Sequence, residues 1–248
     1  MPSVAELTAP YANFMLAPRP GAGVCRTCFN LTDGYDRCYA CTHIPRHVDA
    51  VAPISYSVAH EQLHHALAAY KRLDGTVARR LAIQLAAVLW RYLERHEPCL
   101  ARTAGTANFG LVTTVPSGDP QRNENHPLRR LVSGLVGPTR ERYECLLERT
   151  DTPAKPHEYS ADKFAATRDL AGGAVLLIDD TWTTGASAQS AAAALKAARA
   201  ATVAAVVIGR HVNRDWCEND RLLRSIERPF DWARCAYCPR MDAPENGS

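Results

Sequence analysis

Residues 175–187, which read VLLIDDTWTTGAS, limit the possible folds of this chain more than any other segment. The four apolar residues from Val175 to Ile178 have the pattern of a buried strand. Two acids, Asp179 and Asp180, follow directly, and a short loop then leads into an Ala-rich helix. The segment therefore predicts a strand–loop–helix unit with a ligand site where the strand ends.

The loop after the acids has the chemistry of a phosphate site. Backbone N–H groups at a helix N-terminus lack intrahelical partners, and the helix dipole makes that end positive. Gly185 lets the backbone come close to a ligand, and the loop hydroxyls can add donors. The residues that we expect to bind phosphate are Thr181, Trp182, Thr183, Thr184, Gly185, Ala186 and Ser187.

The acids Asp179 and Asp180 are the candidate catalytic residues. A carboxylate at the end of a strand can accept hydrogen bonds from sugar hydroxyls and stabilise positive charge that develops at an anomeric carbon. The simpler interpretation is that one acid caps the helix. A cap needs only one such residue, however, and the segment has two acids and four hydroxyls. We therefore interpret it as a site for a ribose that carries a phosphate.

Strands and helices are predicted to alternate along the chain. The strands are expected at residues 53–59, 110–115, 143–148, 175–178 and 202–209. The helices are expected at residues 60–75, at 76–95, from about 127 onward and at 187–200. This order predicts an α/β fold with a mainly parallel sheet flanked by helices.

The bulk composition narrows the setting in which the chain works. No apolar run approaches the roughly 20 residues of a membrane span, and Glu6 and Pro10 lie where a signal peptide would be basic and then apolar. We therefore expect a cytoplasmic protein, in which nine cysteines indicate metal binding rather than disulfides. The net charge of +3 gives no argument for nucleic-acid binding, and Arg26, Arg37 and Arg46 are scattered rather than clustered.

Two Cys-x-x-Cys pairs near the N-terminus predict a structural zinc site. Cys25/Cys28 and Cys38/Cys41 are separated by nine residues that include a turn signal at Asp33-Gly34. Paired knuckles of this kind bring four thiolates into the tetrahedron that zinc prefers, and the metal would supply folding energy to a segment too short to fold alone. A structural zinc closes all four coordination positions, so this module is expected to support the fold or a partner contact.

The third pair, Cys235/Cys238, leaves several alternatives open. It could bind a second zinc together with Cys217 and a histidine such as His43 or His211. It could instead replace one N-terminal pair in the first site, or form a labile redox pair. Cys99 and Cys145 are expected to be isolated, buried and apolar in character. The nine histidines show no metal-binding spacing, and His126 is a weak site candidate.

The segment from Val175 to Ser187 resembles the phosphoribosyl pyrophosphate (PRPP) motif of type I phosphoribosyltransferases. The resemblance implies that Asp179 and Asp180 bind the ribose hydroxyls and that the following loop holds the 5′-phosphate. It also implies Mg²⁺ as the ion that bridges the pyrophosphate and the ribose. Trp182 departs from the pattern, because many members of the family have a smaller residue there.

The order of motifs is similar to that of the ComF family, whose members combine a phosphoribosyltransferase fold with a four-cysteine zinc ribbon and are linked to competence and DNA uptake. The shared features are the cysteine ribbon, a helix ending in Lys71, the Val115-Pro116 strand end and the late PRPP motif. The resemblance covers about residues 24–210 and implies that Lys71 and the loop after Pro116 lie near the pyrophosphate. It predicts an N-terminal tail (1–23), a zinc-ribbon module (24–48), a phosphoribosyltransferase-like domain (49–215) and a C-terminal extension (216–248).

Two segments depart from the ComF pattern. After the Val-Pro loop, the family usually has Arg-Gly-Phe-Asn, whereas this chain has RNENHPLRRL. Before the PRPP motif, the family usually has a segment that contains Arg and Gln, whereas this chain has TPAKPHEYSADKFAAT. The cations available in their place are Arg122, Arg129, Lys155 and Lys163. The expected function is transfer of a phosphoribosyl group to a base or amine. The alternatives are a non-catalytic protein that senses PRPP or a nucleotide, and an adaptor for DNA uptake that binds nucleic acid or competence proteins.

Overall fold

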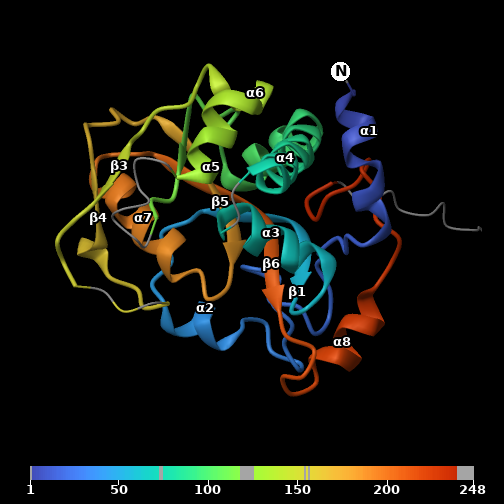
Figure 1. Ribbon diagram of the computed structural model, residues 1–248. Helices are drawn as coiled ribbons and strands as arrows, with labels where there is room; N and C mark the ends of the chain where they lie inside the picture. Colours follow the sequence, from blue (N-terminus) through green and yellow to red (C-terminus); the bar gives the residue numbers. More distant parts are fainter. Residues whose placement is uncertain (1, 73–74, 118–125, 154, 156, 239–248) are drawn as a thin grey trace, which may run out of the picture.

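The computed structural model describes residues 2–72, 75–117, 126–153, 155 and 157–238 (Figure 1). Its centre is a four-stranded sheet in the order β1-β6-β5-β2, with every neighbouring pair parallel. These strands are β1 (Ala50–Val58), β2 (Leu111–Thr114), β5 (Ala174–Trp182) and β6 (Thr202–Val212). A separate antiparallel pair is formed by β3 (Leu147–Arg149) and β4 (Phe164–Ala166).

Helices surround the sheet (Figure 1). The α-helices are α1 (Val4–Thr8), α2 (Tyr39–His43), α3 (Gln62–Arg72), α4 (Gly75–Ala104), α5 (Pro127–Arg130), α6 (Gly137–Arg140), α7 (Ala186–Ala197) and α8 (Asn219–Ile226). Short 3-10 or π turns are η1 (Ala9–Asn13), η3 (Leu131–Leu135) and η4 (Ala161–Lys163). In the described part of the chain, no helix is long and apolar enough to cross a membrane.

Both faces of the sheet are buried, which is why its strands are almost continuously apolar. Side chains alternate along β5, so Leu176 and Ile178 pack in one core with α3 and α4. Val175 and Leu177 point the other way and pack against α7. A parallel sheet with helices on both faces confirms the predicted α/β class.

The predicted elements are present, but several boundaries are wrong. Helix α4 continues to Ala104, beyond the predicted end at residue 95, even though it contains Pro98. The proline removes one helical hydrogen bond and crowds the carbonyl four residues before it, but buried Leu100 and Ala101 hold the last turns on the core. Gly75, expected to end the preceding helix, is the first residue of α4.

Strand β5 also extends further than the sequence predicted. It runs through both acids to Trp182 because β6 continues beside it, pairing Asp179 with Val207 and Thr181 with Gly209. The strand expected at 143–148 is shorter, with β3 starting at 147. The acids therefore lie inside the strand and not after it.

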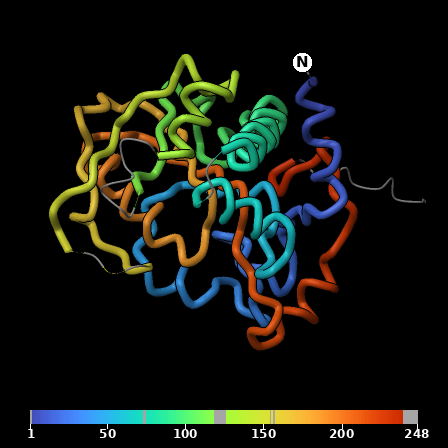
Figure 2. Tube along the Cα trace, in the orientation of Figure 1, coloured from blue at the N-terminus to red at the C-terminus, as the bar shows by residue number. Residues whose placement is uncertain are grey.

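The N-terminal helix α1 and the C-terminal segment around Trp232 pack on the same helix, α4 (Figure 2). Thr8 of α1 accepts a hydrogen bond from Arg91 of α4 at 2.7 Å, and the Arg91 guanidinium lies 4.5 Å from the Trp232 ring centre. The Tyr237 hydroxyl donates to the Val51 carbonyl of β1 at 2.6 Å, so the C-terminal segment also covers an edge of the sheet. The four-part division of the chain stays a prediction.

Candidate functional site

The two acids of β5 point to opposite faces of the sheet, because β5 is still a strand where they occur. Asp180 points toward α3 and is almost fully buried. The Tyr70 hydroxyl donates to its carboxylate at 2.5 Å, and Lys71 Nζ donates to it at 2.6 Å. Lys71, which the ComF resemblance had brought to attention, is thus an ion-pair partner of Asp180.

Further polar groups gather on the Asp180 side. Burial lowers the pKa of His126, while the negative charge of Asp180 acts in the opposite direction. Burial and the charge of Asp180 raise the pKa of Tyr70. His126 Nδ1 and Arg129 Nε are buried and lack a hydrogen-bond partner among the described residues. Arg129 and His126 therefore lie on this side as candidate anion contacts.

Asp179 points into a cavity of about 120 Å³ on the α7 side. The cavity is lined by His157, Asp179, Thr181, Trp182, Thr183, Thr184, Gly185, Ala186, Ser187 and Ala188. It therefore contains one of the two predicted acids and every residue of the predicted phosphate loop. Burial and repulsion by Asp180 raise the pKa of Asp179 to about 7, so its carboxyl gives up a proton less readily than an exposed aspartate.

Glycine is required at position 185 for two reasons, the backbone conformation there and the nearby ring of Trp182. Its φ of 85° is left-handed, and it stands at the N-cap of α7. A Cβ at this position would lie 2.2 Å from Cζ2 of Trp182, so only glycine leaves room for the buried indole ring. Trp182, which departs from the family pattern, thus packs under the loop, and its Nε1 has no hydrogen-bond partner among the described residues.

Lys163 supplies a buried cation to the loop. Its Nζ donates to Ser187 Oγ at 2.9 Å, and its side chain is only slightly exposed. Burial lowers the pKa of Lys163, and the charge of Asp179 opposes that shift. Among the cations considered from the sequence, Lys155 is exposed and Arg122 lies outside the described residues.

The first four cysteines form the cluster that the sequence predicted. The sulfurs of Cys25, Cys28, Cys38 and Cys41 all lie within 4.8 Å of one another and are buried. The Cys28 and Cys38 sulfurs are 3.7 Å apart, close to the edge of about 3.8 Å that a zinc tetrahedron with Zn–S bonds of about 2.3 Å requires. The donor set fits a structural zinc.

Arg210 connects this cluster to the loop. This arginine of β6 is buried, and it donates to the Cys28 carbonyl at 3.0 Å and to the Trp182 carbonyl at 2.9 Å. Its Nη2 also lies 3.7 Å from Cys28 Sγ. A buried guanidinium needs negative charge nearby, and four thiolates around a divalent ion carry a net charge of −2. Arg210 was not among the residues predicted from the sequence, although a charged residue within the apolar run VVIGRHV was a visible signal.

Cys235 and Cys238 form a second cluster with ligands that the sequence analysis did not select. Their sulfurs lie with a nitrogen of His96 and the sulfur of Cys99 within 4.8 Å of one another. The prediction that Cys99 is isolated was therefore wrong, and so was the statement that no histidine has metal-binding spacing. His96 and Cys99 are three residues apart on a helix and share a face, a signal that could have identified them.

The other cysteines and histidines considered for metal binding lie elsewhere. Cys217 is exposed and outside both clusters. His43 and His211 are likewise outside the clusters formed by the described residues. Cys145, expected to be buried, is exposed.

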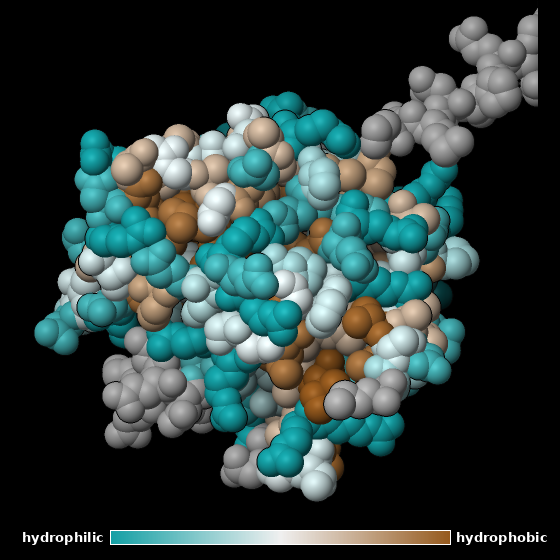
Figure 3. Space-filling view, turned by 90° about the horizontal axis from the view of Figure 1, so that it is seen from above, coloured by the Kyte–Doolittle hydropathy of each residue, from teal (hydrophilic) through white to brown (hydrophobic). Residues whose placement is uncertain are grey.

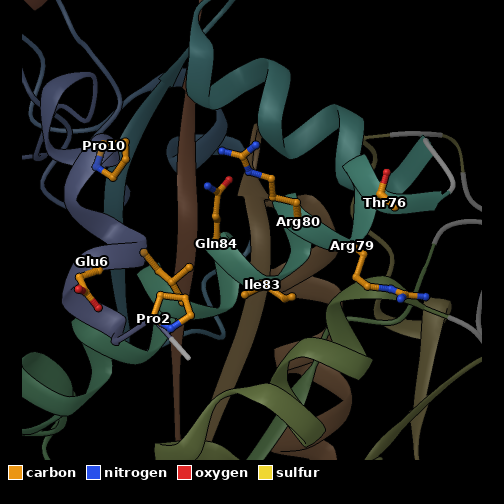
Figure 4. A pocket seen from close by; sticks show the side chains of 9 residues that line it. Pro2, Glu6, Pro10, Thr76, Arg79, Arg80, Ile83 and Gln84 are labelled. Atoms are coloured by element: carbon orange, nitrogen blue, oxygen red, sulfur yellow. The ribbon is translucent and has the colours of Figure 1, made fainter.

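A second, larger cavity lies between α1 and α4 and does not have the chemistry of the Asp179 site. Its volume is about 480 Å³, and Figure 4 shows proline side chains of the N-terminal segment opposite Arg80, Ile83 and Gln84 of α4. The face of the molecule that carries α1 and α4 is largely hydrophilic, with hydrophobic side chains in separate patches (Figure 3). The convergence of acid, loop and buried cation at Asp179 makes that cavity the candidate site.

No protein-family model matches the chain, and no curated protein matches it either. The α/β fold and the zinc-compatible cysteine tetrad agree with a zinc ribbon joined to an α/β domain. The specific resemblance to ComF proteins therefore rests on the residues of the chain itself.

Proposed function

We propose that this chain binds PRPP, or a related ribose 5-phosphate, together with Mg²⁺ and transfers its phosphoribosyl group to a base or amine. The observation that carries the proposal is the cavity at the carboxyl end of β5. There, a carboxylate (Asp179) and the N-terminus of a helix of 12 residues (α7) line one cavity, and a buried lysine (Lys163) donates to Ser187 of its lining. A sugar diol beside a phosphate is the ligand that suits these three groups.

In this proposal the loop binds the 5′-phosphate. The N–H groups at the start of α7 have no partners within the helix, and the dipole adds positive charge. Lys163 reaches Ser187 of the same loop, so its ammonium can pair with a phosphate oxygen after a small rotation. The buried Trp182 ring gives the loop an apolar floor, and a low local dielectric strengthens electrostatic contacts.

Asp179 would bind the ribose. Its carboxylate can accept hydrogen bonds from the two ring hydroxyls, and its negative charge can stabilise the positive charge that develops at the anomeric carbon as pyrophosphate leaves. Bound Mg²⁺ would neutralise pyrophosphate, and carboxylate oxygens such as those of Asp179 are the ligands that it prefers. Lys71 is 36% exposed despite its pairing with Asp180, so it can also contact an anionic ligand.

Among known families, we propose a ComF-like protein, because the order of the cysteine cluster, the lysine, the Val-Pro pair and the acid pair along the chain agrees with that family. The cysteine cluster precedes β1, Lys71 ends α3, Val115 and Pro116 follow β2, and the acid pair lies in β5. Each of these positions supports the resemblance found in the sequence.

The proposal is tested by calorimetry with PRPP and Mg²⁺, followed by a pyrophosphate-release assay over a panel of bases and amines. We expect PRPP to bind to the wild-type chain at least tenfold more tightly than to Asp179→Asn. Asp169→Asn is a suitable control, because Asp169 is an exposed partner of Arg199 outside the cavity. Equal affinity of the wild type and Asp179→Asn, or no PRPP binding at all, would refute the proposal.

A second function, PRPP or nucleotide sensing without turnover, is favoured by one observation. Both oxygens of the Asp180 carboxylate are already engaged by Tyr70 and Lys71, so only Asp179 faces the cavity. A site with one free carboxylate can hold a ribose without assisting its transfer. Tight PRPP binding with no pyrophosphate release for any acceptor would support this second function.

A further inference from the structure

The C-terminal segment contains a group of side chains that the proposed function does not use. His96 and Cys99 of α4 meet Cys235 and Cys238, although the pairs are separated by more than 130 residues in the sequence. All four donor atoms lie within 4.8 Å of one another, and the two residues of α4 are buried.

We propose that His96, Cys99, Cys235 and Cys238 form a second zinc site, which fastens the C-terminal segment to α4. Three sulfurs and one imidazole are a donor set that zinc binds in closed, structural sites. The proposal is independent of what the Asp179 cavity binds.

The distances match a tetrahedral ion. Zinc bonds of about 2.3 Å to sulfur and about 2.0 Å to nitrogen place the ligand atoms roughly 3.5–3.8 Å apart. Cys238 Sγ lies 3.6 Å from Cys235 Sγ, 3.6 Å from His96 Nδ1 and 4.0 Å from Cys99 Sγ. These three separations are within a few tenths of an ångström of those in a zinc tetrahedron.

The imidazole of His96 is already oriented for a metal. Its Nε2 lies 3.0 Å from the Trp232 carbonyl, and a carbonyl can only accept a hydrogen bond. The proton must therefore be on Nε2, which leaves the lone pair of Nδ1 facing Cys238. Metal-bound histidines are commonly held by a carbonyl on the other nitrogen in this way.

Backbone amides donate to both sulfurs of the C-terminal pair. The N–H of Cys235 donates to Cys238 Sγ at 3.2 Å, and the N–H of Tyr237 donates to Cys235 Sγ at 3.4 Å. Such hydrogen bonds favour the negatively charged thiolate, the form that binds metal.

The position of the site explains what a second zinc would do. Residues 227–238 contain no helix or strand, and they are held on α4 and β1 mainly by Trp232 and Tyr237. A segment without regular structure has few hydrogen bonds of its own, so a metal ion with two ligands on each side would keep it in place.

Native mass spectrometry of the full chain, purified with a reducing agent and zinc, tests the proposal. We expect two zinc ions for the wild type and one for Cys99→Ser or Cys238→Ser. Cys217→Ser is the matched control, because Cys217 is an exposed cysteine of the same part of the chain, and it should keep two. The zinc retained at the first site would show that the variants still fold.

A second measurement uses only the wild type. Trypsin should cut after Arg228 or Arg234 much faster once a chelator has removed the more weakly held zinc. One zinc in the wild type would overturn the proposal, whether Cys235 and Cys238 were joined in a disulfide or present as free thiols. Unchanged cleavage after the loss of the second zinc would contradict the fastening role.

Discussion

The two faces of the central sheet each have one acid and one cysteine-rich cluster, but they use the acid differently. On the α7 face, Asp179 is open to a cavity, and the first cysteine cluster is joined to the loop of that cavity through Arg210. On the α3 and α4 face, Asp180 is paired with Tyr70 and Lys71. One face thus leaves its acid open to the ligand that we propose, while the other uses the same kind of side chain to hold the fold together.

Removal of the first metal site should cause the largest loss of stability, because this site supports both the fold and the α7 face of the sheet, on which we propose that the ligand binds. Cys28→Ser takes away one zinc ligand and the sulfur near Arg210. We expect the free energy of unfolding to fall by at least about 4 kcal/mol, and PRPP binding to be lost with it. Denaturant titration and zinc analysis measure this, with Cys217→Ser as the control for the loss of an exposed thiol.

A Cys28→Ser chain that loses zinc but keeps both its stability and its PRPP affinity would contradict the difference that we infer between the two faces of the sheet. It would mean that the first cluster does not support the loop, despite the hydrogen bonds of Arg210 to both.

Replacement of Asp180 should have the second-largest effect, a loss of stability. Asp180→Ala leaves the buried Tyr70 hydroxyl without its acceptor and Lys71 without its counter-ion. We expect a loss of about 2–4 kcal/mol in the free energy of unfolding. Asp169→Ala, which breaks an exposed ion pair with Arg199, should leave the stability nearly unchanged. Equal stability of the two variants would show that Asp180 is not a structural acid.

The difference between the two acids could not be predicted from the sequence. Adjacent aspartates look equivalent, and acids after an apolar run predict the end of a strand. In the structure, β6 continues beside β5, and the alternation of side chains then sends the acids to opposite faces. The strand–loop–helix unit itself was predictable, because its apolar run and small loop residues are local signals.

The two cysteine clusters differ in how far apart their ligands lie along the chain, and this difference decides which of them the sequence can predict. The ligands of the first lie within residues 25–41, so regular spacing was enough to predict it. Cys99 and Cys238 are 139 residues apart, and only the packing of the C-terminal segment on α4 brings them together. Local spacing therefore predicts a metal site that folds its own segment, whereas a site between distant segments depends on the fold.

Replacement of Lys163 should have a smaller effect, on the affinity for PRPP. Lys163→Met keeps the length and apolar packing of the side chain but removes the charge next to Ser187. A charged hydrogen bond contributes about 1.5–3 kcal/mol, so we expect PRPP to bind roughly tenfold more weakly in calorimetry. Lys155→Met is the control, since Lys155 is an exposed lysine of the preceding segment. If both variants bound PRPP equally well, Lys163 would not contact the phosphate.

The smallest expected effect is a gain in stability that depends on pH. The pKa of Asp179 is raised to about 7, mainly by burial and then by Asp180, so the folded state disfavours its charged form. The carboxyl therefore favours folding below its unfolded pKa, and this contribution is lost as the pH rises toward 7. Asp179→Asn removes the penalty and should stabilise the chain by about 1–2 kcal/mol at pH 8, after allowance for solvent screening.

Between pH 8 and pH 5 the stability difference between Asp179→Asn and the wild type should shrink by more than half, because the folded wild type takes up a proton on Asp179 that the unfolded chain does not. All other ionisable groups are the same in the two proteins, so the difference between them isolates Asp179. A stability difference that did not change between pH 5 and pH 8 would contradict the raised pKa. A variant that gains stability at pH 8 while losing PRPP affinity would identify Asp179 as an acid that the fold keeps at a cost because the ligand needs it.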